Sequence, residues 1–329
     1  MKIGKLPPDR LHALVLGRLG KRRDDVLLRP AVGEDSAVVD FGDEVCIISS
    51  DPITGAGARL GELAVHVSCN DVAANGASPV GVQVVLLLPE SYPEQELAVL
   101  MEDIDKAAGE LGIEVLGGHT ELTSKVREPL VVVTALGRAP RHGFVSSGGA
   151  RPGDDLVISK GIGIEGTAIL ATDFEELLRP LVGEEVIARS QGFWSEISVV
   201  PEGRIGAAQG VSAMHDVTEG GLYGALWEMA EASKVGVEVW QEQVPVREET
   251  ALICQHLGLD PLGLISSGTM LFATPRGREL VDALAEEGIR AGIIGHATDG
   301  LRVVHGKAGD KRILDGPGED ELWRFLQTK

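Results

Sequence analysis

Three aspartates occupy positions that would bring their carboxylates to one edge of a predicted sheet. Asp35 begins the first strand of a predicted hairpin and Asp51 ends the second, so antiparallel pairing across the turn at 42–43 places them nearly opposite each other. Asp71 lies near the C-terminal end of a predicted helix over residues 59–75, where the helix dipole disfavours a negative charge by about 0.3–1 kcal/mol. Carboxylates directed at one place repel one another unless a cation is bound, and oxygen ligands without histidine or thiolate suit Mg²⁺. We therefore predict a metal site formed by these three aspartates.

Each of the three aspartates also has a purely structural interpretation. Asp35 could be a turn residue, Asp51 a cap residue, and Asp71 a partner for Arg59 or for a backbone amide. The combination, and not any single residue, indicates the metal site. The adjacent Asn70 offers a neutral amide that could bind a base, a phosphate or a neighbouring residue.

Two glycine-containing segments could bind phosphate. In VLGGHTELT (115–123), Gly117 and Gly118 follow a predicted strand at 113–116, which would leave backbone amides free to approach an anion, and Thr120 lies in the polar run that follows. In ISKGIGIEGTAIL (158–170), Lys160 and Gly161 precede a helix N-terminus that favours an anion. Neither segment is a Walker A or GxGxxG motif, so the common nucleotide-binding folds are not indicated.

The elements that must position these residues divide the chain into two parts. A chain of 329 residues exceeds what one hydrophobic core usually organises. Residues 138–155 are rich in Gly, Pro, Ser and charge, so we predict an N-terminal domain over 1–145 and a C-terminal domain over 146–329. The first half is strand-rich, with an apolar strand at 80–88 that we expect to be covered on both faces, and the second half alternates helices and strands.

The composition excludes several classes of partner. The formal net charge of −20 argues against nucleic acid or an anionic membrane as the main partner. The three cysteines have no spacing typical of a disulfide framework or a zinc site. No signal-peptide stretch or membrane-spanning run is visible, so we expect a cytoplasmic protein.

At this point the sequence resembles the aminoimidazole-ribonucleotide (AIR) synthetase, or PurM-like, superfamily. This superfamily includes that purine enzyme, thiamine-monophosphate kinase, selenophosphate synthetase and the hydrogenase expression/formation (HypE) branch, to which the chain is most similar. The resembling segments run in the family's order along nearly the whole chain: GEDSAVVD (33–40), SSDPITG (49–55), CNDVAANGASP (69–79), GGHTEL (117–122), SKGIGIEGT (159–167), HDVTEGGL (215–222) and SSGTMLFAT (266–274).

The resemblance implies a fold and a site. The fold class is α+β (α/β), with a mixed N-terminal sheet that joins the sheet of a second subunit in a β-barrel across a homodimer, and with a C-terminal α/β domain. ATP and Mg²⁺ are expected in a cleft at the dimer interface. The positions of Asp35, Asp51 and Asp71 are expected to carry the metal–phosphate site.

From the residues and the resemblance together we expect an ATP- and Mg²⁺-dependent enzyme that activates or phosphorylates an oxygen of an unidentified small acceptor. His215 and Asp216, which end a predicted strand, are candidate catalytic residues at the acceptor end, as a base or an orienting pair, although they could simply cap the next helix. The alternatives are activity like that of thiamine-monophosphate kinase or AIR synthase, or a non-catalytic nucleotide-binding partner of a maturation protein. The candidate cofactor-binding residues are Asn70, Gly117, Gly118, Thr120, Lys160 and Gly161.

The sequence departs from the family pattern in two places. Related proteins tend to carry Asp where this chain has His119, which puts a fourth acidic metal contact in question. The maturation branch uses a C-terminal Pro-Arg-Ile-Cys tail, whereas this sequence ends ELWRFLQTK and has no cysteine after Cys254. The apolar spacing of that ending predicts a short packed helix. We therefore expect that the chain does not perform the branch's dehydration of a thiocarbamoyl group on its own cysteine.

Overall fold

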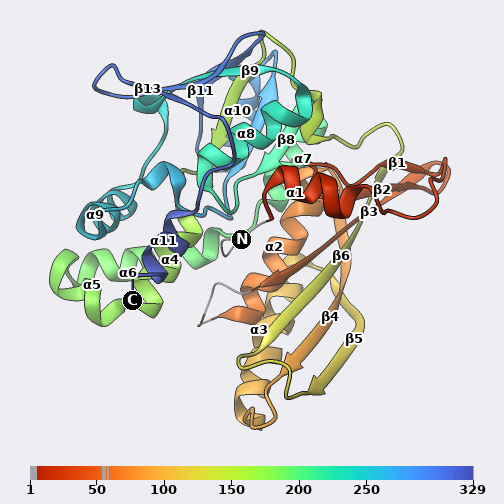
Figure 1. Ribbon diagram of the computed structural model, residues 1–329, viewed down its shortest axis with the longest axis vertical. Coiled ribbons are helices and arrows are strands. Elements are labelled where there is room, and N and C mark those ends of the chain that lie inside the picture. The colour runs from red at the N-terminus through yellow and green to blue at the C-terminus, as the bar shows by residue number, and fades with distance from the viewer. Residues whose placement is uncertain (1–5, 54–56, 58, 329) are drawn as a thin grey trace.

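The computed structural model describes residues 6–53, 57 and 59–328, which form two β-sheets with helices packed against them (Figure 1). One sheet is built from strands within residues 26–140 and the other from strands within 155–313. The predicted α+β (α/β) class, with a mixed first sheet, is confirmed.

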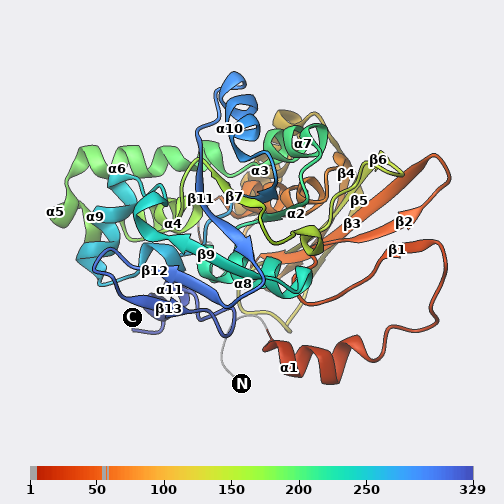
Figure 2. The same cartoon turned by 90° about the horizontal axis from the view of Figure 1, so that it is seen from above.

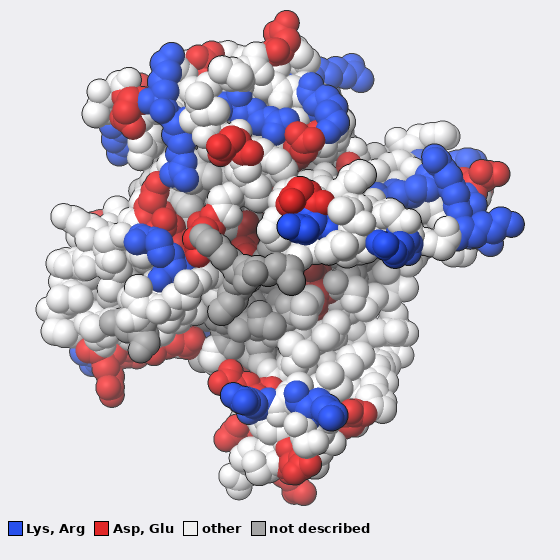
Figure 3. All heavy atoms as spheres, viewed as in Figure 1, with Lys and Arg blue, Asp and Glu red and all other residues white. Residues whose placement is uncertain are grey.

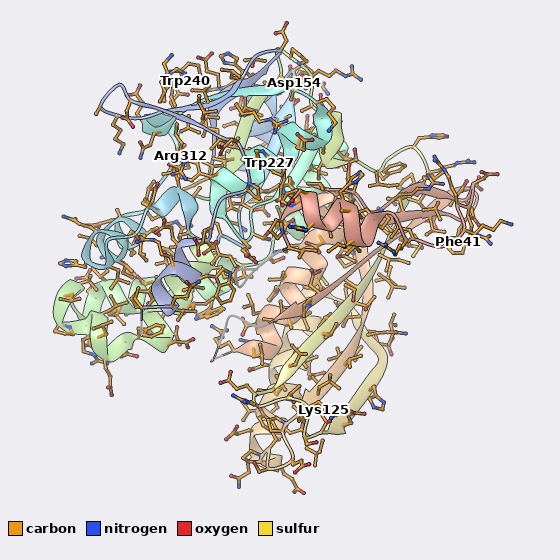
Figure 4. All side chains as sticks on the ribbon, in the orientation of Figure 1. Phe41, Lys125, Asp154, Trp227, Trp240 and Arg312 are labelled. Carbon is orange, nitrogen blue, oxygen red and sulfur yellow. The ribbon has the colours of Figure 1, made fainter. Side chains whose placement is uncertain are left out.

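Among the described residues the first sheet has six strands in the order β1-β2-β3-β6-β4-β5, of which only the neighbours β4 and β5 are parallel. Its strands are β1 (Val26–Leu28), β2 (Ala37–Asp40), β3 (Glu44–Ile53), β4 (Ser78–Leu88), β5 (Glu114–Leu122) and β6 (Leu130–Pro140). Helices α2 (Leu60–Ala74) and α3 (Glu94–Leu111) cover one face of this sheet (Figures 1 and 2). The predicted hairpin is confirmed as β2 and β3, and the exposed Phe41 lies at its tip (Figure 4).

The other face of the first sheet is open and largely apolar. Along β4 the side chains alternate, so that Val82, Val84 and Leu86 are buried under the helices while Val85 and Leu87 are only partly buried. In the described part of a single chain only one face of this strand is covered, so cover on both faces stays a prediction about an assembly. An apolar face of this kind needs another surface to cover it.

We expect the open face to hold two copies of the chain together. Val132 lies on this face in β6, between the buried Val131 and Val133, so Val132→Asp places a charge there and should convert a dimer into a monomer. The matched control is Val99→Asp on the exposed side of α3, which should stay dimeric. Sedimentation velocity at micromolar concentration tests both variants, and a folded wild-type monomer would contradict the prediction.

Gly117 and Gly118 lie within a strand and not in a loop after one. The expectation that a strand ends at residue 116 was wrong, because β5 continues to Leu122. A Cβ atom on Gly118, at φ 150°, would lie 1.7 Å from the carbonyl oxygen of Val84. Close approach to β4, next to an irregularity in the pairing, therefore explains this glycine.

In the part of the chain that the structure describes, the second sheet has seven strands in the order β13-β12-β9-β11-β7-β10-β8, with only β12 and β9 parallel. Its strands are β7 (Asp155–Ser159), β8 (Ala213–Asp216), β9 (Gly236–Trp240), β10 (Met270–Thr274), β11 (Ala291–Thr298), β12 (Arg302–His305) and β13 (Lys311–Ile313). Helix α8 (Gly221–Ser233) packs on one face, and α7 (Val200–Gln209) and α10 (Gly277–Glu286) pack on the other. The guanidinium carbon Cζ of Arg302 in β12 lies 5.7 Å from the ring centroid of Trp227 in α8 (Figure 4).

The remaining helices are short. They are α1 (Pro8–Leu11), α4 (Ile164–Asp173), α5 (Glu175–Val182), α6 (Glu184–Gln191), α9 (Glu248–Leu257) and α11 (Glu321–Leu326). The short terminal helix predicted from the apolar spacing is confirmed as α11, whose Leu322 and Phe325 are buried. Among the helices of the described residues, none has the length and apolar character that crossing a membrane requires.

Charge is unevenly distributed on the surface. Lys21, Arg22 and Arg23 lie in the exposed turn before β1, and Figure 3 shows Lys and Arg gathered at the end of the molecule where β1 and β2 lie. Acidic side chains lie on the same face where the two halves of the molecule meet (Figure 3). The strongly negative net charge therefore coexists with a basic tip far from the junction of the sheets.

Candidate functional site

Ser49 is the centre of the contacts that join the three predicted metal-binding aspartates. Its Oγ atom lies 2.5 Å from Asp71 Oδ2, 3.2 Å from Asp51 Oδ2 and 3.0 Å from the main-chain oxygen of Asp35. Ser49 and Asp51 point to the helix-covered side of β3 because side chains alternate along a strand. The structure thus brings Asp35, Asp51 and Asp71 together, as the sequence predicted.

Asp71 is the most constrained of these carboxylates. It lies in the last turn of α2, which is buried on nearly all sides, and its side chain points toward β3. Burial, followed by the nearby charges of Asp51, Asp216 and Asp35, raises the pKa of Asp71 well above its ordinary value. A bound divalent cation would remove this repulsion, and four carboxylates form a donor set that suits Mg²⁺.

Asp216 is the fourth carboxylate of this group. It ends β8 in the second sheet and is buried. Ligand atoms of Asp35, His215 and Asp216 all lie within 4.8 Å of one another. The sequence interpretation placed Asp216 at the acceptor end, whereas the structure places it among the predicted metal ligands.

His215 joins the two halves of the molecule. Its Nδ1 lies 2.6 Å from Asp35 Oδ2, and its Nε2 lies 3.0 Å from Glu228 Oε2. Burial alone would lower the pKa of His215, but the charges and hydrogen bonds of Asp35 and Glu228 outweigh it and raise that pKa well above 6.5. Both ring nitrogens are engaged and the side chain is buried, so the geometry suits an orienting residue better than a base.

Asn70 connects α2 to the second half of the chain. Its Nδ2 donates a hydrogen bond of 2.8 Å to the carbonyl oxygen of Ile197, and its Oδ1 accepts one of 2.8 Å from the backbone N–H of Val199. The side chain is fully buried. In this structure Asn70, which the sequence suggested as a cofactor-binding residue, holds the segment 197–199 beside Asp71.

Lys160 and Gly161 make their contacts within the second half of the chain. The ammonium of Lys160 is 2.8 Å from the carboxylate of the buried Glu202 and donates to the carbonyl oxygens of Glu196 and Ser198. Gly161 lies under the segment that contains Pro245, whose carbonyl oxygen would be 3.1 Å from a Cβ atom at this position. In this structure both residues are engaged by these groups, and their role at a phosphate stays a prediction.

Gly117, Gly118 and Thr120 lie on the exposed edge strand β5. Gly118 pairs with Val84, Val84 pairs with Val133, and Val133 pairs with Asp51. These three strand spacings separate the glycines from the acidic group by about 14 Å within one chain. His119, on the same strand, lies 3.0 Å from Glu121 and so makes a local contact.

A cleft of about 280 Å³ opens beside the acidic group, between the two halves. Burial and the charge of Asp35 raise the pKa of Glu34 in this cleft to about 7. Burial also raises the pKa of Glu165 to about 6, although the backbone N–H of Ser267 donates to its Oε2 at 3.2 Å. The cleft is lined from both halves, by residues that include Glu34, Asp35, Asp51, Asp71, Glu165, Thr218, Glu219, Ser267 and Trp323.

Sequence reasoning did not identify Glu34, Glu165 or Trp323 as site residues. Glu34 directly precedes Asp35 of the predicted metal site, and Glu165 lies in the glycine-rich segment 158–170. Both residues are therefore close to features that the sequence analysis used. Trp323 belongs to the apolar pattern of α11, which predicted packing and gave no indication of a cleft. Only the folded chain shows that this helix reaches the site.

Comparisons with known proteins match both halves of the chain. The family model described as AIR synthase related protein, N-terminal domain, matches residues 33–139, and the corresponding C-terminal domain model matches 151–306. A putative hydrogenase expression/formation protein of Methanocaldococcus jannaschii is 30% identical over 307 residues, which are 88% of each protein. Carbamoyl dehydratase HypE of Azotobacter vinelandii is 32% identical over 283 residues, which are 83% of this chain and 81% of that protein.

Solved structures show the same fold. The hydrogenase maturation protein HypE in complex with ATP has a TM-score of 0.72 and 25% identity, with 96% of each chain covered. The HypE–HypF complex contains a chain with a TM-score of 0.76 and 22% identity, which covers 94% of this chain and 99% of that one. Both matches span nearly the whole chain, so they include both sheets.

Proposed function

Because this chain belongs to the AIR synthase related protein family, with hydrogenase expression/formation proteins among its relatives, we propose that it is an ATP- and Mg²⁺-dependent enzyme of the hydrogenase maturation type. Its ATP activates or phosphorylates an oxygen of a small acceptor. It acts as a homodimer and with a maturation-type protein partner in the cytoplasm. The relative that was solved with ATP supports the nucleotide, since it matches this chain over 96% of its length.

The convergence of Asp35, Asp51, Asp71 and Asp216 carries this proposal. A protein with a net charge of −20 can hold a triphosphate beside buried carboxylates only if cations bridge the two. The carboxylates come from β3, α2, β8 and the turn before β2, so no single element explains their meeting. Mutual repulsion of the four carboxylates lowers the stability of the fold, and a bound cation with its phosphates would relieve that repulsion.

Each group of residues has a separate role in the proposed reaction. Mg²⁺, when bound, neutralises charge on the transferring phosphoryl group. The four aspartates would hold the cation, and the Ser49 hydroxyl, 2.5 Å from Asp71 Oδ2, orients the carboxylate of Asp71. His215 orients Asp35, and Asn70 keeps the segment 197–199 next to the site. Positioning of this kind supplies most of the catalysis expected in phosphoryl transfer.

The exposed strand β5 is proposed to complete the site of the other copy in the dimer. Within one chain Gly117, Gly118 and Thr120 lie about 14 Å from Asp51, measured as three strand spacings. Their backbone amides and hydroxyl are exposed at an edge that a second sheet can approach. The phosphates would then lie between the aspartates of one chain and the glycines of its partner.

Binding of ATP is expected to require the divalent cation. Isothermal titration calorimetry of the wild-type protein should detect ATP in the presence of Mg²⁺ and lose that signal after EDTA treatment, because the phosphates would otherwise face the acidic group directly. ADP formation with candidate acceptors then distinguishes an enzyme from a binding partner. Equal ATP affinity with and without the cation would refute the metal-binding role.

The three cysteines are expected to stay unmodified during maturation-type chemistry. The thiolate is the reactive form, and burial raises the pKa of both Cys69 and Cys254 to about 12 and also raises that of Cys46. After incubation of the 329-residue chain with carbamoyl phosphate, a carbamoyl-transferring partner and ATP, intact-mass spectrometry should show no cysteine-linked adduct. Iodoacetamide labelling of the urea-unfolded chain is the positive control, and an adduct on the native chain would contradict the prediction.

A further inference from the structure

Glu165 is a buried carboxylate on the wall of the cleft that the second half contributes. It lies in the first turn of α4, and its side chain lines the cleft. The wall that the first half contributes carries Asp35, Asp51 and Asp71. A small molecule in the cleft would therefore have the predicted metal–phosphate site on one side and Glu165 on another.

The loop before β10 fixes the N-terminus of α4. Ser266 Oγ accepts hydrogen bonds from the backbone N–H groups of Gly163 and Ile164, at 2.7 and 3.3 Å. Thr269 adds a further link, since its hydroxyl oxygen lies 2.8 Å from Ser266 Oγ and its hydroxyl donates to the carbonyl oxygen of Gly161. The first turn of α4 is thus joined by hydrogen bonds to a loop that also lines the cleft.

The same loop holds the carboxyl group of Glu165. The backbone N–H of Ser267 donates to Glu165 Oε2 at 3.2 Å, and Ser267 is itself buried and lines the cleft. One turn further along α4, the hydroxyl oxygen of Thr167 lies 2.9 Å from that of Thr250 in α9. A carboxylate that its own helix and a neighbouring loop both hold is already in place before a substrate binds.

The surroundings of Glu165 suit a group that accepts a proton near neutral pH. Burial raises the pKa of Glu165 to about 6, against hydrogen bonds from Ser267 that lower it, and the charge of Glu219 adds to the rise. Asp320, at the N-terminus of α11, is a further charged neighbour, because the charge of Glu165 contributes to the raised pKa of Asp320. A base is most effective when its pKa lies near the working pH.

Other groups near the cleft are less suitable as a base. Both ring nitrogens of His215 are engaged by carboxylates. The four aspartates are predicted to hold the cation, and a bound cation lowers the basicity of a carboxylate. Glu34 directly precedes Asp35, whose charge acts on it. Glu165 instead meets the cleft from α4, in the second half.

We propose that Glu165 is the catalytic base that takes the proton from the reacting oxygen of the acceptor, and that this oxygen belongs to a hydroxyl group. The inference rests on the proposed function and adds the residue that meets the acceptor and the class of acceptor. As the acceptor oxygen forms its bond to the γ-phosphorus, the bond from that phosphorus to the β–γ bridging oxygen breaks and ADP leaves. The hydroxyl proton passes to the carboxylate of Glu165 and is then released to water, so the step needs no other reactant.

Water serves as the probe acceptor, since it carries the same O–H group. Release of phosphate from Mg·ATP by the full chain should rise with pH up to about 6 and then level off. Glu165→Gln should lower this rate by at least about 100-fold, because a general base contributes about 10²–10⁴-fold. Its affinity for Mg·ATP in calorimetry should equal that of the wild type. Glu176→Gln, at an exposed position of α5, is the matched control and should keep wild-type turnover.

Two further measurements separate a base from a structural residue. Formate should restore turnover to Glu165→Ala in proportion to its concentration, because it can replace the missing carboxylate in the cleft. The second measurement needs no turnover. The raised pKa of Glu165 means that the wild type loses stability as pH rises from 4.5 to about 6, so the melting temperature of Glu165→Gln should increasingly exceed that of the wild type over this range.

Several outcomes would overturn the inference. They are phosphate release by Glu165→Gln at the wild-type rate, no rescue of folded Glu165→Ala by formate, a melting-temperature difference that does not change with pH, or a wild type that binds Mg·ATP and releases no phosphate. Calorimetry that detects no binding of Mg·ATP to the wild type would instead refute the proposed nucleotide site, so the two failures are distinguishable.

Discussion

Replacing Asp71 with asparagine should weaken Mg²⁺-dependent ATP binding by at least about 100-fold, since changes that only surround metal ligands already cost about 10–100-fold in metal affinity. The substitution removes the charge but hardly changes the volume, and the hydrogen bond from Ser49 can still be made. Calorimetry with Mg²⁺ and ATP measures the loss. Asp282→Asn, which removes an exposed carboxylate of α10, is the matched control and should bind ATP normally.

The same variant should be at least as stable as the wild type when no cation is bound. The pKa of Asp71 is raised in the folded state, so folding favours its protonated form, and stability falls as pH rises from the ordinary value of 3.8 toward the folded-state pKa. Asparagine does not titrate, so the variant does not lose stability in this pH range. The melting temperature of Asp71→Asn should therefore match the wild type in acid and exceed it at neutral pH.

Two outcomes would contradict this prediction. A large fall in melting temperature with normal ATP affinity would show that Asp71 is a structural residue. The second is a wild-type melting temperature that rises toward neutral pH while that of Asp71→Asn does not. This result would show that a cationic neighbour already compensates the charge of the Asp71 carboxylate. Saturating Mg²⁺ and ATP should stabilise the wild type and leave the variant nearly unchanged, because only a state that binds the ligand is stabilised by it.

Replacing His215 with glutamine should destabilise the protein strongly. Removing one partner of a buried charge pair typically costs about 3–5 kcal/mol, because the remaining charge is left buried and uncompensated. Here two carboxylates, those of Asp35 and Glu228, lose their shared partner at the junction of the two halves. We expect a clear fall in melting temperature. Glu228→Gln, which leaves Asp35 and His215 paired, is the matched control and should cost less.

The pH dependence separates an orienting role from that of a base. The pKa of His215 is raised in the folded state, so its stabilisation is fully present below 6.5 and is lost as pH rises through the folded-state pKa. The difference between wild type and His215→Gln should therefore be largest in mild acid and shrink in alkali. If His215 were instead the base, the variant would lose turnover while its melting temperature stayed near that of the wild type.

Local pattern was sufficient for the hairpin, for helix α2 and for the aspartates. The hairpin that carries Asp51 follows from alternation around a glycine turn, and the helix that carries Asp71 follows from its apolar spacing and its glycine stop. Because strand pairing across a short turn is set by neighbouring residues, the meeting of Asp35 and Asp51 could be predicted from the sequence. The approach of Asp71 required one further inference, that its helix packs on that sheet.

Other assignments depended on contacts between residues far apart in the chain. Asn70 was predicted to bind a cofactor, but its amide is used by backbone groups of residues 197 and 199. Lys160 looked like a phosphate-binding cation, but it is engaged by Glu202 and two carbonyl groups. Periodicity predicts which side of a helix or strand is buried. It does not predict which residue, far away in the sequence, forms a hydrogen bond or ion pair with a given polar atom.

The sequence by itself determined the hairpin of β2 and β3, the helix that carries Asp71 and three of the converging carboxylates, because these depend on periodicity and on short turns. Tertiary structure alone decided that Asp216 joins the group, that His215 is held between Asp35 and Glu228, and that Trp323 lines the cleft. These residues come from opposite halves of the chain. Their positions follow from how the two sheets pack together, which no local pattern specifies.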